Sequence, residues 1–172
     1  SLVGGFTYIN LHLAAAPYQF STADLANVFA VYLLGVVITP ISGKILPLLG
    51  ARKSILIAMS VSAIGLLLTL LPAAWMIIVA LAIMSSGIFI TQSSTISFIA
   101  HHVPVGRSLA SGLYYMGYYA GGSVGAWVCG LAYTQGAWPL TVAVILVAQL
   151  LSLLLVFWLM PPPVTSAVIR QH

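Results

Sequence analysis

Residues 43–54 read "GKILPLLGARKS". The stretch holds three of the five basic residues of the chain, Lys44, Arg52 and Lys53. Apolar runs at about 24–42 and 54–72 flank it, and each is close to the roughly 20 residues that a helix needs to cross a bilayer. We therefore interpret the stretch as a short loop that joins two membrane crossings.

The composition of the whole chain supports this interpretation. Hydrophobic residues make up 62% of the chain and charged residues 3%, whereas a soluble domain carries about 25% charged residues. Such a chain cannot cover a water-facing surface, so its partner is the lipid bilayer. Five basic residues are too few for a nucleic-acid-binding patch, and no nucleic-acid partner is expected.

Helices account for all the expected crossings, because the apolar runs lack the alternation of barrel strands. A sixth apolar run, 1–17, is interpreted as the end of a truncated helix, which suggests that the chain is a fragment. The other expected helices are 24–42, 54–72, 74–100, 108–133 and 137–160, and "TQGAWP" separates the last two. Before 24–42, Ser21 and Asp24 have the spacing of a capping box.

The basic residues predict how these helices are oriented. Besides the loop at 43–54, they occur at Arg107 in the connection 101–107 and at Arg170 in the C-terminal tail. Six antiparallel crossings place all three regions on one side, which the positive-inside rule assigns to the cytoplasm. Tryptophans near helix ends are expected to form an aromatic belt: Trp75, Trp127, Trp138 and Trp158.

The distribution of polar residues suggests an internal repeat. Helices 54–72 and 137–160 are almost uniformly apolar and are expected to face lipid, whereas the other four carry the polar groups. The order polar, polar, apolar occurs twice over three crossings each, so the second unit is inverted relative to the first. The expected fold is an all-α membrane protein of six transmembrane helices in two inverted three-helix repeats, an arrangement typical of transporters.

Several polar side chains inside the crossings are candidate cavity residues. A primary amide in lipid needs partners, so Gln92 is expected to face a helix or a cavity. His12 is the only titratable side chain well inside a crossing, and either a functional role or a simple bond to a neighbouring helix fits it. The complete candidate set is Tyr8, Asn10, His12, Tyr32, Gln92, Tyr115 and Tyr119.

The helix 108–133 presents two faces. Gly117, Gly121 and Gly125 are four residues apart, a spacing that lets another helix approach closely. Tyr115 and Tyr119 lie on roughly the opposite side, where they either pack or line a binding surface.

Nothing in the sequence predicts an enzyme. The chain has no nucleophile–base pair, phosphate loop or cofactor fingerprint, and no cofactor is expected. His101 and His102 are adjacent but have no cysteine or carboxylate near them, so no metal site is expected either.

Three segments carry a resemblance to a known family. "GKILPLLGARKS" resembles the loop that joins the second and third helices of each half in the major facilitator superfamily, with Pro47 where the family prefers Asp. "HHVPVGRSLASGLYYMGYYAGGSVG" (101–125) resembles the start of the eleventh helix in drug-efflux-like members, and "YQFSTAD" (18–24) the turn before the eighth.

The resemblance implies that this chain is the C-terminal half of a twelve-helix transporter, with the absent N-terminal six-helix half as its partner. It also implies a bacterial inner membrane location, alternating access and exchange of an efflux solute for protons. The implied gating residues are Gly43, Gly50, Arg52, Lys53 and Arg107. Pro47 cannot supply the charge of the family's Asp, which weakens the lock formed by this loop.

Aromatic side chains and the lack of fixed charge favour a drug-like or amphiphilic small molecule as the solute. Two alternatives stay open at this point. One is uptake of a metabolite or sugar by a carrier of the same superfamily, and the other is a membrane scaffold or receptor without transport.

Overall fold

The computed structural model describes residues 2–15, 18–26, 28, 30, 31, 33 and 50–160. Within these residues the chain is helical and contains no strand. The predictions made for Tyr32, Gly43, Lys44, Pro47 and Arg170 lie outside the described residues.

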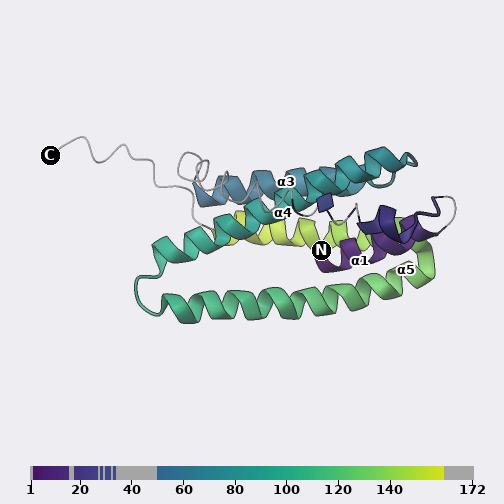
Figure 1. The fold of residues 1–172 in the computed structure, drawn as a ribbon. Coiled ribbons are helices and arrows are strands. Elements are labelled where there is room, and N and C mark those ends of the chain that lie inside the picture. Colours follow the sequence, from purple (N-terminus) through teal and green to yellow (C-terminus); the bar gives the residue numbers. More distant parts are fainter. Residues whose placement is uncertain are drawn as a thin grey trace.

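Four helices form the described structure (Figure 1). They are α1 (Leu2–Ala14), α3 (Ala51–Leu68), α4 (Ala74–His102) and α5 (Arg107–Leu159). Of the described helices, α3, α4 and α5 are long and apolar enough to cross a membrane. An all-helical membrane protein is therefore the fold class that the structure supports.

Helix α5 is a hairpin of two arms. Its 53 residues are interrupted by non-helical backbone at Gly136 and Ala137, just before Pro139. Figure 1 shows the chain reversing direction there, so that the first arm (107–135) and the second arm (138–159) run antiparallel. This break lies inside "TQGAWP", the segment expected to separate the last two crossings.

The connections place the basic segments at one end. The start of α3, the link between α4 and α5, and the end of the second arm all lie at the left of Figure 1. The turn between α3 and α4 and the α5 hairpin lie at the opposite end. The assignment of this end to the cytoplasm stays a prediction.

Helices α3 and α4 approach each other through glycines. A Cβ added at Gly65 would lie 2.8 Å from the backbone nitrogen of Met84 and 2.9 Å from the carbonyl oxygen of Ala80. A Cβ added at Gly87 would collide with the carbonyl oxygen of Ala58 and lie 2.9 Å from the nitrogen of Ser62. Only a residue without a side chain permits this backbone contact.

Helix α1 also packs closely against the first arm of α5, where glycines of each contact side chains of the other. A Cβ at Gly4 would lie 2.7 Å from the Sγ of Cys129, and a Cβ at Gly130 would collide with the hydroxyl of Tyr8. By contrast, a Cβ at Gly117, Gly121 or Gly125 would meet no described atom within 4 Å. Close helix packing along that predicted stripe therefore stays a prediction.

Trp138 anchors the hairpin end of the bundle. Its side chain is 2% exposed, and its Nε1 donates a hydrogen bond of 3.1 Å to the hydroxyl of Thr69. The expectation that Trp138 belongs to an interfacial belt is wrong, because the α5 hairpin turns its indole into the core. Trp75, Trp127 and Trp158 are exposed.

The glycine contacts predict a strong positional effect on stability. In the intact protein, Gly87→Ala should destabilise the fold by about 1–3 kcal/mol, because backbone atoms of α3 must move to admit the methyl group. Gly112→Ala is the matched control, because no described atom lies within 4 Å of its added Cβ. Melting temperatures in detergent check this, and equal melting temperatures for the two variants would contradict the account.

Candidate functional site

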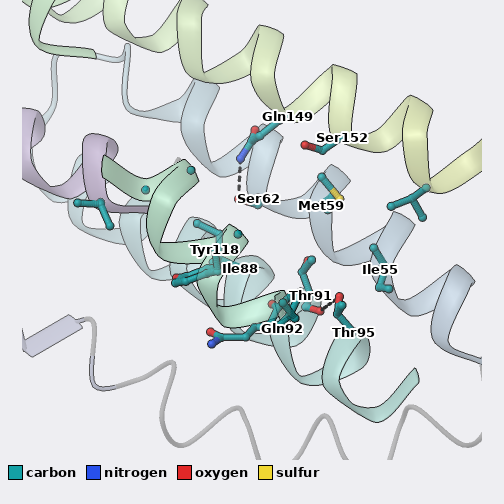
Figure 2. A pocket seen from close by; sticks show the side chains of 16 residues that line it. Ile55, Met59, Ser62, Ile88, Thr91, Gln92, Thr95, Tyr118, Gln149 and Ser152 are labelled. Atoms are coloured by element: carbon teal, nitrogen blue, oxygen red, sulfur yellow. Dashed lines mark hydrogen bonds between the residues drawn. The ribbon is translucent and has the colours of Figure 1, made fainter. Parts of the chain in front are cut away.

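A cavity of about 410 Å³ lies between α3, α4 and both arms of α5 (Figure 2). Val3 of α1 closes one side. The polar side chains that line it are Ser62, Thr91, Gln92, Thr95, Tyr114, Tyr118, Gln149 and Ser152. No charged side chain is among the lining residues, so the cavity is polar but uncharged.

Gln149 is a deeply buried polar group of this cavity, at 5% exposure. Its Nε2 donates a hydrogen bond of 3.0 Å to the hydroxyl of Ser62 on α3, which Figure 2 shows as a dashed line. Its Oε1 is buried and has no hydrogen-bond partner among the residues that the structure describes. An unpaired buried amide oxygen costs about 1–3 kcal/mol, so the fold holds an acceptor that a bound group could satisfy.

This amide corrects the interpretation of two helices. Both 54–72 and 137–160 were expected to face lipid because they are so apolar. In the structure, each of these helices has an exposed face and a buried face. On the second arm of α5, Leu150, Leu151 and Leu154 are exposed, while Gln149 is buried. The helices meet through their few polar residues.

Three other hydroxyl side chains of the cavity, on α4 and on the second arm of α5, donate hydrogen bonds to carbonyls of their own helices. Thr91 donates to the carbonyl of Gly87 at 2.8 Å, and Thr95 donates to the carbonyl of Thr91 at 2.8 Å. Ser152 likewise donates to Ala148 at 2.9 Å. Such bonding to the preceding turn is common for hydroxyl side chains in membrane helices. Because these hydrogens are engaged, the hydroxyl oxygens are left as acceptors.

Tyr114 and Tyr118 form the aromatic wall, with ring centroids 6.3 Å apart. The predicted pair, Tyr115 and Tyr119, is absent from the lining and is 37% and 66% exposed. Gly117 and Gly121 do line the cavity, where their lack of side chains leaves space. Of the candidate residues that the structure describes, Gln92 alone lines it.

The candidate residues of α1 lie elsewhere. Tyr8 packs on Gly130 of the first arm, and its ring centroid is 5.5 Å from that of Tyr133. Asn10 donates back to the carbonyl of Phe6 at 2.6 Å. None of the three predicted α1 residues lines this cavity, so their place in a binding surface stays a prediction.

His12 is in contact with two aromatic rings. It stacks on Trp138 with ring centroids 5.8 Å apart and meets Tyr18 edge-on at 5.5 Å. This half-buried ring therefore packs at the hairpin end of the bundle, and a functional role for it stays a prediction.

Arg52 joins the start of α3 to the end of α5. Its Nη2 donates a hydrogen bond of 2.7 Å to the carbonyl of Phe157, and its guanidinium lies 5.0 Å from the centroid of the Phe157 ring. A cation is favourable there because the last carbonyls of a helix lack intrahelical partners. Lys53 and Arg107 are exposed, and Gly50 precedes α3 with φ 76°, which favours glycine.

Asp24 and Ser21 form the predicted capping box. The Asp24 carboxylate accepts hydrogen bonds from the nitrogen and the hydroxyl of Ser21, at 3.0 and 2.6 Å. The backbone nitrogen of Asp24 donates to the Ser21 hydroxyl at 3.2 Å. The hydrogen bonds from Ser21 lower the pKa of Asp24, so this exposed carboxylate keeps its charge near neutral pH.

No group of three or more His, Cys, Asp or Glu side chains that could hold a metal ion occurs among the described residues. The side chains that line the cavity offer hydrogen bonds and aromatic contacts to a bound molecule.

Comparisons with known proteins agree with a membrane transport role. The family model of the Major Facilitator Superfamily matches residues 2–171. An uncharacterized transporter of Buchnera aphidicola subsp. Schizaphis graminum (strain Sg) is 29% identical over 124 residues, which are 72% of this chain and 30% of that protein. The chain thus spans well under half of that relative's length. No solved structure matches the chain significantly.

The contacts of Arg52 lead to a prediction that separates it from its neighbour. Arg52→Gln should destabilise the intact protein by about 1–2 kcal/mol, because the charged hydrogen bond to Phe157 and the ring contact are both lost. Lys53→Gln is the control, and its effect should stay within about 0.5 kcal/mol. Thermal unfolding in detergent measures both, and a Lys53 effect as large as that of Arg52 would show that general charge, and not this contact, matters.

Proposed function

The chain belongs to the Major Facilitator Superfamily, and we propose that it is the C-terminal six-helix half of a secondary transporter that moves a small molecule by alternating access. The match over 2–171 and the similarity to a protein described as a transporter support a role in membrane transport. The absent partner in this proposal is the N-terminal half of the same protein. The two halves rock around the solute and expose it to each side in turn.

The observation that carries the solute class is the uncharged lining of the cavity. Phosphates and other anions call for buried Arg or Lys, whereas this cavity offers amides, hydroxyls and the rings of Tyr114 and Tyr118. A drug-like or amphiphilic solute matches these groups. Gln92 is common to the sequence prediction and the cavity, and we propose that it contacts the solute.

The first arm of α5 supplies the surface for the missing half. Tyr115 and Tyr119 are 37% and 66% exposed, on the side of this arm opposite Gly117 and Gly121, which line the cavity. Exposed aromatic side chains of this kind suit packing against a second helical domain. In this proposal the predicted residues Tyr8, Asn10, His12, Tyr32, Tyr115 and Tyr119 form binding contacts at the surface shared by the two halves.

The proposed coupling ion is the proton. Coupling needs a group whose charge changes with conformation near working pH. Asp24 is unsuitable, because its exposed carboxylate has a lowered pKa and caps a helix. His12 is the one candidate left by the sequence for this half, and it does not line the cavity. We therefore expect the coupling carboxylate in the N-terminal half.

The proposed setting is a bacterial inner membrane. The relative in Buchnera aphidicola supports a bacterial setting. The start of α3, with Arg52 and Lys53, and the start of α5, with Arg107, lie at one end of the bundle (Figure 1), which supports a cytoplasmic location for that end. We propose accordingly that 43–54, 101–107 and the C-terminus are cytoplasmic. The same arrangement places the α5 hairpin on the opposite side.

Reconstitution of the intact transporter into vesicles tests this function. With an imposed pH gradient, an uncharged amphiphilic fluorescent dye should move against its own gradient, and protons should move in the opposite direction. Vesicles without protein serve as the control for passive diffusion. Flux of the dye and internal pH are recorded together.

The outcomes separate the alternatives. Solute flux without proton movement would contradict proton coupling, and accumulation of a sugar or metabolite in the opposite direction would favour the uptake carrier. Absence of any protein-dependent flux over a panel of solutes would contradict transport and leave the scaffold or receptor.

A further inference from the structure

We propose that the cavity between α3, α4 and α5 selects uncharged aromatic solutes that donate a hydrogen bond, and that the Oε1 of Gln149 is the acceptor that recognises the donor. The inference rests on the proposed function, because it names the class of solute that this half binds. Its own evidence is the position and bonding of a single buried amide.

The first step of the argument is the state of that amide. Gln149 is 5% exposed and lines the cavity, yet only one end of its amide is bonded. The Nε2 is held by Ser62 at 3.0 Å, and the Oε1 is buried with no partner among the described residues. In a membrane protein, hydrocarbon cannot provide that partner, so a group inside the cavity is the available source.

The second step is the surroundings of the amide. Thr91, Thr95 and Ser152 line the same cavity, and each has its hydroxyl hydrogen directed at a backbone carbonyl of its own helix. Each oxygen keeps a lone pair that can accept. These oxygens add hydrogen-bond acceptors to the lining of the cavity, and a solute carrying an O–H or N–H group can donate to them.

The third step is the rigidity of the acceptor. Ser62 lies beside Gly87, at the point where α3 and α4 are in closest contact. A serine held by a backbone contact fixes the amide that donates to it. A preoriented acceptor binds a donor without the entropy cost of ordering a free side chain.

The fourth step concerns the size and the aromatic character of the ligand. The cavity volume of about 410 Å³ lies in the range of small-molecule sites, and its apolar lining includes Ile55, Met59 and Ile88. Tyr114 and Tyr118 contribute aromatic faces. The absence of charge from the lining disfavours an ionised ligand, because a buried charge without a counter-charge is costly.

A pair of probes that differ in one donor tests the proposal. 7-Hydroxycoumarin and 7-methoxycoumarin share one ring system, and only the first donates a hydrogen bond. Their equilibrium binding to the intact protein in detergent is measured at pH 6. The hydroxyl compound should bind about fivefold more tightly, as expected for one neutral hydrogen bond.

The variants locate this preference. Gln149→Met keeps the size of the side chain and removes the acceptor, so the ratio of the two affinities should fall to about one. Gln135→Met makes the same replacement at an exposed position outside the cavity and should keep the fivefold ratio. Ser62→Ala retains the amide but removes the group that holds it, and should reduce the ratio partially. Melting temperatures establish that each variant is folded.

Several results would overturn the proposal. They are equal affinities in the wild type, no measurable binding of either probe, a ratio unchanged in Gln149→Met, and tighter binding of the methyl ether. Flux of 7-hydroxycoumarin through vesicles is read separately. Selective binding without any flux would contradict the transport proposal and leave the recognition by Gln149 standing.

Discussion

The lack of water in the hydrocarbon core is the constraint on which this structure depends. A polar side chain in a membrane helix must find a partner inside the protein. Thr91 and Ser152 meet this demand by bonding to the preceding turn of their own helices, and Trp138 meets it by bonding to Thr69 across the bundle. Gln149 meets it only halfway, through Ser62. Of the buried side-chain atoms without a partner in the described part of the chain, the Oε1 of Gln149 is the one that belongs to the cavity lining.

Backbone contact between helices determines where the cavity can form. Gly65 and Gly87 bring α3 and α4 together so closely that no side chain fits between them. Gly4 and Gly130 leave room for the side chains of Cys129 and Tyr8, which lie between α1 and the first arm of α5. Gly117 and Gly121 instead face open space and line the cavity. Glycines therefore have two roles here: some bring helices together, and others leave volume for a bound molecule.

Several features were predictable because their signals are local. The capping box at Ser21 and Asp24 depends on residues three apart, and the turn at Gly50 depends on a residue that tolerates positive φ. Gln92 could be predicted as a cavity or interface residue because an amide in an apolar helix needs partners. These inferences needed only the residue and its neighbours along the chain.

The remaining features depend on how helices rotate and pack, which spacing alone does not determine. Tyr114 and Tyr118 line the cavity in place of Tyr115 and Tyr119, a shift of one residue or about 100° around the helix. Gln149 carries the same signal as Gln92, but the apolar residues around it led to the prediction that its helix faces lipid. The burial of Trp138 follows from the α5 hairpin, which the sequence alone does not show. An isolated Gln in an otherwise apolar crossing was the available signal for the cavity.

Labelling at the cavity from each side of the membrane tests the central claim most directly. In the intact transporter, Cys129 is replaced by Ala and Gln92 by Cys, and a membrane-impermeant thiol reagent is applied from either side. Alternating access predicts that the new thiol reacts from both sides and that bound solute lowers the rates. A thiol that reacts from neither side, with or without solute, would contradict a solute pathway through this cavity.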